Sequence, residues 1–168
     1  MPYRGKGLMG FGEAVRTCLR KYVDFQSRAR RSEYWWFVLF VVLVGLVAGI
    51  LDRLIAGDVH MRQGPVSVIT SLALLLPSLA VSVRRLHDID RTGWWILIFY
   101  VAAIVLIFAA LGAAFTGSPG TALVLLLAIG ALSVWLLVWF VTKGTTGPNR
   151  FGPDPLAGEE QNPSPAPA

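Results

Sequence analysis

The stretch RRLHDIDRTGWW, residues 84–95, brings titratable side chains of both signs together between two apolar runs. An imidazole beside a carboxylate, as in His87 and Asp88, offers groups for general acid–base catalysis. The guanidinium groups of Arg84 and Arg85 are suited to binding phosphate or carboxylate groups. The stretch is therefore a candidate catalytic loop, a candidate lipid- or partner-binding patch, or a salt-bridged connection between two helices.

Catalysis by this stretch lacks partners in the sequence. Neither a recognisable nucleophile nor a complete set of metal ligands accompanies His87, so we expect no catalytic residue, no metal and no cofactor. The other histidine, His60, lies between the first two apolar stretches of the chain. If these stretches cross a membrane, as argued next, His60 is predicted on the side opposite His87. As a structural connection, the stretch would pair Arg84 with Asp88 across one helical turn, and Gly93 would permit a sharp reversal.

Four long apolar stretches must position this connection. They contain no Asp, Glu, Lys, Arg or His and span residues 34–51, 66–83, 94–115 and 122–142. As helices they would each extend about 27–33 Å, which matches a hydrocarbon core of roughly 30 Å. Only 15% of the chain is charged, against about 25% for a soluble domain. The sequence predicts an all-α fold, a four-helix transmembrane bundle.

Basic residues are divided unequally between the two ends of these stretches. Thirteen lie before the first stretch, between the second and third, or after the fourth, and two lie in the first connection. Because cytoplasmic loops carry the excess of Lys and Arg, we predict a multi-pass membrane protein with both termini in the cytoplasm. The same bias explains the basic composition, so we expect no nucleic-acid partner.

The segment FGEAVRTCLRKYVDF, residues 11–25, predicts an amphipathic helix. Its apolar side chains recur at helical spacing, and charged residues occupy the remaining positions. The helix would lie in the cytoplasmic membrane interface, or dock on the protein's own cytoplasmic loops, or both. Cys18, the one cysteine, falls on the apolar face and is expected to pack there.

The chain therefore divides into four predicted parts. Residues 1–33 form a cytoplasmic N-terminal segment with the amphipathic helix, and 34–142 form the four-helix transmembrane domain. Residues 143–155 form a Gly/Pro-rich cytoplasmic segment, because glycine and proline dominate KGTTGPNRFGPDP. Residues 156–168 form a Pro-rich, disordered tail with little to bury.

Small residues predict how the membrane helices pack. Lipid provides no hydrophobic force between helices, so small and hydroxyl-bearing side chains mark the contacts. Gly45 and Gly49 lie four apart in the first apolar stretch, and Ser71 and Ser78 share a face of the second. We predict that these faces meet, although the glycines are equally suited to a homo-oligomer. The serine face, with Pro77, also leaves a solute pathway open.

Two tryptophan pairs, Trp35–Trp36 and Trp94–Trp95, occur where apolar stretches enter the bilayer from the predicted cytoplasmic side. Indole prefers the headgroup level, and neighbouring arginines can reach lipid phosphates. These tryptophans are therefore predicted interfacial aromatics.

Three stretches taken together, FQSRARRSEYWWF (25–37), RRLHDIDRTGWW (84–95) and GPNRFGPDP (147–155), resemble the small bacterial inner-membrane proteins grouped as domain of unknown function 805. The resemblance implies a helical, four-spanning protein and assigns no reaction. The family usually has glycine at the position of Ser27. The matching residues form the candidate cytoplasmic polar cluster: Arg28, Arg31, Glu33, Arg84, Arg85, His87, Asp88, Arg91, Asn149 and Asp154.

The leading functional hypothesis is a non-enzymatic integral inner-membrane protein. Its basic cytoplasmic face would bind anionic lipid headgroups or a membrane protein partner, since residues 1–33 carry a net charge of +5 and the first connection carries none. One alternative is a membrane-embedded enzyme acting on lipid headgroups through His87 and Asp88. Another is a small-solute transporter or exporter.

Overall fold

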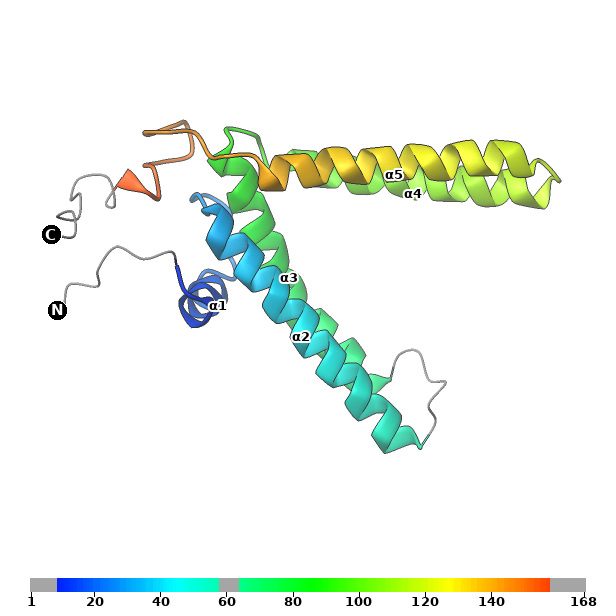
Figure 1. Cartoon of the computed structure of the whole chain (residues 1–168), viewed down its shortest axis with the longest axis horizontal. Coiled ribbons are helices and arrows are strands. Elements are labelled where there is room, and N and C mark those ends of the chain that lie inside the picture. The colour runs from blue at the N-terminus through cyan, green and yellow to red at the C-terminus, as the bar shows by residue number, and fades with distance from the viewer. Residues whose placement is uncertain (1–8, 58–63, 158–168) are drawn as a thin grey trace, which may run out of the picture.

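The structure, a computed structural model, describes residues 9–57 and 64–157. This part of the chain consists of five helices joined by short segments (Figure 1). They are α1 (Phe11–Arg20), α2 (Arg31–Ala56), α3 (Pro65–Asp88), α4 (Trp94–Phe115) and α5 (Pro119–Val141). Helices α2 to α5 are long and apolar enough to cross a membrane. The predicted all-α fold with four spans and an N-terminal amphipathic helix is confirmed.

Proline and glycine set the ends of the spans. Pro65 and Pro119 stand in the first turn of α3 and α5, where a missing N–H costs no helical hydrogen bond. Gly57 ends α2 in the left-handed conformation, with φ 65°. Gly117 adopts the same conformation, with φ 73°, in the turn between α4 and α5. The turn at 116–118 is correspondingly short.

The spans form two antiparallel hairpins, α2/α3 and α4/α5, which meet at one end and diverge from there (Figure 1). We call this end the basic end; it comprises the starts of α2 and α4, the ends of α3 and α5, α1, and the segments 21–30, 89–93 and 142–157. The rest of α4 and α5 is apolar on all sides, with most side chains exposed, as expected of helices that face lipid.

Two apolar clusters lie close to the basic end. One joins the two hairpins and contains Leu86 of α3, Ile96 and Phe99 of α4, and Trp139 and Phe140 of α5. Tyr34 of α2 stacks on Phe140, with ring centroids 4.5 Å apart. The hairpins are therefore fixed to one another mainly at this end.

The second cluster docks α1 on the α2/α3 hairpin. Cys18 of α1 packs with Ala29, Phe37 and Val81, and all four are buried. Nearby Leu19 of α1 stays exposed. The amphipathic helix thus rests on the protein with one side and leaves apolar and basic side chains on the other, which accommodates both interpretations of it.

The contact between α2 and α3 differs from the predicted one. Ala48 is the buried small residue of α2, whereas Gly45 is exposed, Gly49 is half-buried, and a Cβ at either glycine would meet nothing within 4 Å. The predicted partners on α3, Ser71 and Ser78, are exposed and half-buried. The reason is that the buried carboxylates Glu33 and Asp52, near the two ends of α2, must face the protein. They fix the rotation of the helix.

Candidate functional site

The first polar contact of the basic end is a buried ion pair between α3 and α2. Nη1 of Arg84 lies 2.5 Å from Oε1 of Glu33, and the side chains are 0% and 6% exposed. The Cys18 thiol of α1 donates to the same Glu33 oxygen at 3.6 Å. Burial, and then the charge of Glu33, raises the pKa of the Cys18 thiol to about 12. Three helices therefore meet at one carboxylate.

The second contact is centred on Asp88, at the end of α3. Its Oδ1 accepts from Nε and Nη2 of Arg28, at 3.1 and 3.0 Å, and its Oδ2 accepts from Nη1 of Arg85. The predicted partner of Asp88 was Arg84, four residues before it; the observed partner on the same helix is Arg85, three residues before it. The local prediction was wrong because Arg84 faces α2, where Glu33 takes its charge.

Arg28 and Arg85 also bind backbone carbonyl groups in the last turn of α5 and in the segment after it. Arg85 donates to the carbonyl oxygens of Phe140, at 3.2 Å, and Thr142. Arg28 donates to those of Gly147, at 2.7 Å, and Thr145, at 2.6 Å. The last carbonyls of a helix lack intrahelical partners and carry partial negative charge, so these guanidinium groups cap α5 and hold the segment that follows it.

The Gly/Pro-rich segment is itself folded by capped turns. The Asn149 amide donates to the His87 carbonyl at 2.9 Å, and Asp154 accepts from the backbone N–H of Gly147 and of Leu156, both at 2.8 Å. Burial opposes ionisation of Asp154, but these hydrogen bonds and the charges of Arg28 and Lys143 outweigh it and lower the pKa. All three polar stretches of the sequence thus converge.

His87 packs against Phe151, at the edge of a pocket between the end of α3 and the start of α4. Its side chain is buried, and the ring stacks on Phe151 with centroids 3.8 Å apart and planes 5° apart. Within residues 9–57 and 64–157, no three His, Cys, Asp or Glu side chains are grouped to hold a metal ion. His60 lies outside the described residues. This geometry favours a structural role for His87.

Two members of the predicted polar cluster lie at the surface instead of in the network. Arg31 is exposed and donates to the Val141 carbonyl at 3.3 Å. Arg91 is exposed, and its guanidinium carbon lies 4.9 Å from the centre of a Trp139 ring. The other eight members come together, and Arg84 and Arg85, expected to contact headgroups, are fully buried.

The predicted interfacial aromatics differ in exposure. Trp35 and Trp36, in the second turn of α2, are partly exposed, and Trp94 at the start of α4 is largely exposed. Trp95 is half-buried and packs edge-on against Trp139 of α5. Three of the four rings are therefore available at the basic end of the spans.

A buried carboxylate at the far end of the α2/α3 hairpin was not among the predicted residues. Asp52 of α2 accepts from the backbone N–H groups of Gly64, Val66 and Ser67, at 3.1, 2.9 and 2.8 Å. An anion at a helix N-terminus satisfies unpaired donors and the helix dipole, so Asp52 caps α3. The available signal was an acidic residue after an apolar stretch, followed by the helix start at Pro65.

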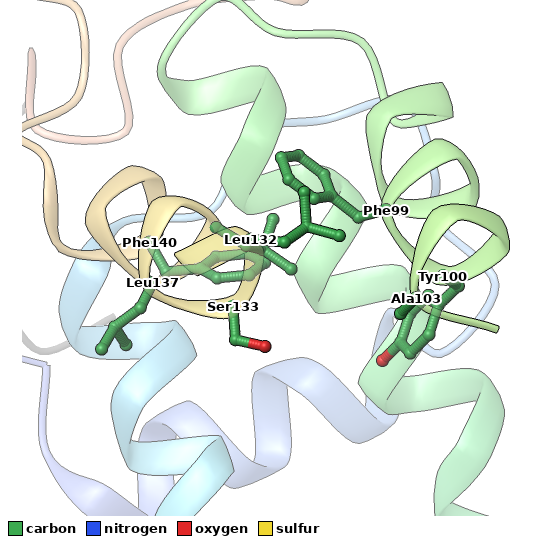
Figure 2. Close-up of a pocket in the computed structure, with 8 residues that line it drawn as sticks. Phe99, Tyr100, Ala103, Leu132, Ser133, Leu137 and Phe140 are labelled. Carbon is green, nitrogen blue, oxygen red and sulfur yellow. The ribbon is translucent and has the colours of Figure 1, made fainter. Parts of the chain in front are cut away.

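An apolar pocket of about 320 Å³ lies between α4 and α5 (Figure 2). The two hydroxyl groups in its wall belong to Tyr100 and Ser133, and the Ser133 hydroxyl already donates to the Ile129 carbonyl at 2.9 Å. No charged side chain lines it. The pocket faces the membrane region and offers little chemistry beyond contact with apolar groups.

The charges of the basic end are sorted between interior and surface. Most of its carboxylates are wholly or partly buried: Glu33 and Asp88 are buried, Glu13, Asp24 and Asp154 are half-buried, and Asp90 is exposed. The exposed basic residues are Arg16, Arg20, Lys21, Arg31, Arg91, Lys143 and Arg150. The surface at this end is therefore strongly cationic.

This combination of four apolar spans and an internal arginine–carboxylate network defines an integral membrane protein. The chain belongs to the family described as "Protein of unknown function (DUF805)", whose model matches residues 22–153. It is 36% identical to Inner membrane protein YhaH of Escherichia coli over 139 residues, which are 82% of this chain and 91% of that protein. It is also 36% identical to Inner membrane protein YhaI over 142 residues, 84% of this chain and 94% of that protein. No solved structure matches the chain.

Proposed function

We propose that the protein is a non-enzymatic component of the bacterial inner membrane whose basic end binds anionic lipid headgroups at the cytoplasmic surface. The observation that carries this proposal is the sorting of charge. Seven basic side chains are exposed at the basic end against one exposed carboxylate, that of Asp90. A basic residue near an anionic bilayer surface contributes about 1 kcal/mol before screening by salt.

The depth of these cations in the membrane supports the proposal. Arg31 begins α2 and Lys143 follows α5, so both lie where a span leaves the hydrocarbon. Trp36 and Trp94 lie at the same end, and indole rings favour the headgroup level. Lipid phosphates would therefore lie within reach of the exposed guanidinium and ammonium groups.

The proposal relies on arginines other than Arg84 and Arg85. Arg84 is paired with Glu33, and Arg85 is bonded to Asp88 and to backbone carbonyls. Both would therefore stabilise the fold and bind no lipid. Helix α1 is the better candidate, because Arg16 and Arg20 are exposed beside apolar residues such as Leu19. A helix with this composition is suited to lie in the membrane interface.

The orientation of the protein follows from the same charges. An excess of Lys and Arg marks the cytoplasmic side, and the cytoplasmic leaflet is the one rich in anionic lipid. The proposal therefore places both termini and the 89–93 turn in the cytoplasm.

Competition between lipids tests the proposal. The protein would be reconstituted in nanodiscs made from an equimolar mixture of phosphatidylglycerol and phosphatidylcholine, and the lipids retained on gentle detergent extraction would be counted by mass spectrometry. We expect enrichment of phosphatidylglycerol, which falls several-fold when Arg16→Gln and Arg20→Gln are combined. Arg53→Gln is the matched control, because Arg53 is exposed at the far end of α2. Equal retention of both lipids by the unmodified protein would refute the proposal.

A further inference from the structure

A small cavity opens at the basic end between the start of α2 and the segment after α5. Its volume is about 110 Å³, and its wall includes Arg30, Arg31 and Lys143 together with Asp88 and Asp154. The hydroxyl-bearing Thr145 and Thr146 complete the polar part of the wall. Since a water molecule occupies about 30 Å³ of liquid, the cavity has room for a group with three or four oxygen atoms. That is the size of a tetrahedral oxyanion.

The two carboxylates in the wall are already occupied. Both oxygens of Asp88 accept from guanidinium groups, one from Arg28 and the other from Arg85. Asp154 accepts backbone N–H groups through Oδ1 and Oδ2. The charge of Asp88 is therefore compensated by two guanidinium groups, and both oxygens of Asp154 are already hydrogen-bonded, so the two carboxylates oppose an entering anion only weakly.

The cations in the wall approach from two sides. Arg30 is the N-cap residue of α2 and Arg31 is the first residue of this helix of 26 residues, whose N-terminus carries partial positive charge. Lys143 comes from the segment after α5. Arg31 uses Nη1 for the Val141 carbonyl, and a guanidinium group has five N–H donors in all. Three cations around a cavity of this size suit a group with more than one negatively charged oxygen.

We infer that this cavity is a phosphate-binding site, filled by the phosphate of an anionic lipid headgroup or by inorganic phosphate. In its lipid form the inference rests on the proposed function, because it names one discrete site within the cationic surface. Arg31 and Lys143 would contact the phosphate oxygens, while Arg28 and Arg85 compensate the charge of Asp88 in the wall. The position of the site at the end of two spans is the depth at which a lipid phosphate lies.

Two soluble probes distinguish the sources. The protein would be purified in nanodiscs of phosphatidylcholine and titrated by calorimetry with inorganic phosphate and, separately, with short-chain dihexanoyl phosphatidylglycerol. We expect saturable binding of at least one probe, weakened at least about tenfold when Arg31→Gln and Lys143→Gln are combined. Saturation by inorganic phosphate alone would assign the site to free phosphate, and saturation by the lipid would assign it to a headgroup.

Control variants separate this inference from the proposed function. Arg53→Gln, at an exposed position on the far end of α2 and outside the cavity, should leave saturable binding unchanged. Lys143→Arg should retain more of the binding than Lys143→Gln does. The thermal midpoint of each variant checks that it is folded. Failure of both probes to saturate, or equal binding to the cavity variant and the unmodified protein, would overturn the inference. Retained enrichment of anionic lipid in that case would leave the proposed function standing.

Discussion

Arg84 and Glu33 form an ion pair from which water is excluded, although they are 51 positions apart in the chain. Their side chains join the end of α3 to the start of α2, at the level where the spans leave the hydrocarbon. Desolvating two charges costs several kcal/mol, so such a pair is weak evidence for stability. Its value lies in fixing how the two helices are rotated, because neither charge can turn outward into lipid.

Removing one partner of this pair should be strongly destabilising. Glu33→Gln leaves the Arg84 charge buried, and we expect the free energy of unfolding to fall by about 3–5 kcal/mol. Combining Glu33→Gln with Arg84→Met should recover much of that loss, because no uncompensated charge remains. Unfolding in a mixed-micelle denaturant titration measures the free energies of both variants.

The exposed pair Arg150–Asp90 is the matched control, and Asp90→Asn should cost at most about 1 kcal/mol. Equal effects of the two single substitutions would contradict this account.

The cap on α3 makes a second prediction. Asp52→Ala removes the acceptor of three backbone N–H groups, so the unfolding free energy should fall by about 1–2 kcal/mol. The neighbouring substitution Arg53→Gln changes a charge at an exposed position and should have little effect. Thermal unfolding followed by circular dichroism compares the two, and similar midpoints for both variants would show that Asp52 caps nothing.

The thiol of Cys18 should resist alkylation. Burial, followed by the charge of Glu33, raises its pKa to about 12, and the thiolate is the reactive form. We expect little labelling by iodoacetamide at pH 8 until the protein is unfolded. A Cys18→Ser, Lys21→Cys variant supplies an exposed thiol next to the same helix and should label readily. Comparable labelling rates for the two native-state proteins would contradict the docking of α1.

The turn between α1 and α2 should become less stable in acid. Burial opposes ionisation of Asp24, but hydrogen bonds from the Ser27 hydroxyl and from the backbone N–H groups of Gln26 and Ser27 lower its pKa from 3.8 to about 2. The folded pKa lies below the unfolded one, so this stabilisation is present above about pH 4 and is lost as the pH falls through 2.

Asp24→Asn should remove that dependence. We expect it to lower the unfolding free energy by about 1 kcal/mol at pH 7 and by almost nothing at pH 2. Thermal midpoints of the variant and the unmodified protein, measured between pH 2 and 7, would therefore converge in acid. Curves that stay parallel over this range would rule out an ionised Asp24 as the source.

The elements of this fold could be predicted because each depends on local composition. Four uncharged stretches give four spans, and the spacing of Phe11, Ala14 and Cys18 gives the amphipathic helix. The convergence of the three polar stretches also followed, because the threading brings them to one side. The family suggested by those stretches is confirmed.

The partners within the network depended on information that local spacing lacks. Arg84 is four residues from Asp88 and Arg85 is three, and both spacings permit a pair on a helix. The choice is made by Glu33, which faces α3 from another helix. The same applies to Asp52, whose carboxylate oxygens accept from backbone N–H groups 12 or more residues later in the chain. It also applies to Gly45 and Gly49, because the rotation of α2 leaves them beside its contact with α3.

Preference for anionic lipid at the basic end is tested most directly by tryptophan fluorescence. All six tryptophans, at positions 35, 36, 94, 95, 135 and 139, lie in the parts of α2, α4 and α5 nearest this end. The protein would be reconstituted in vesicles containing brominated phosphatidylglycerol or brominated phosphatidylcholine at the same mole fraction. Our account predicts stronger quenching by the anionic lipid, and a difference that shrinks as salt is added. Equal quenching by the two lipids at low salt would contradict it.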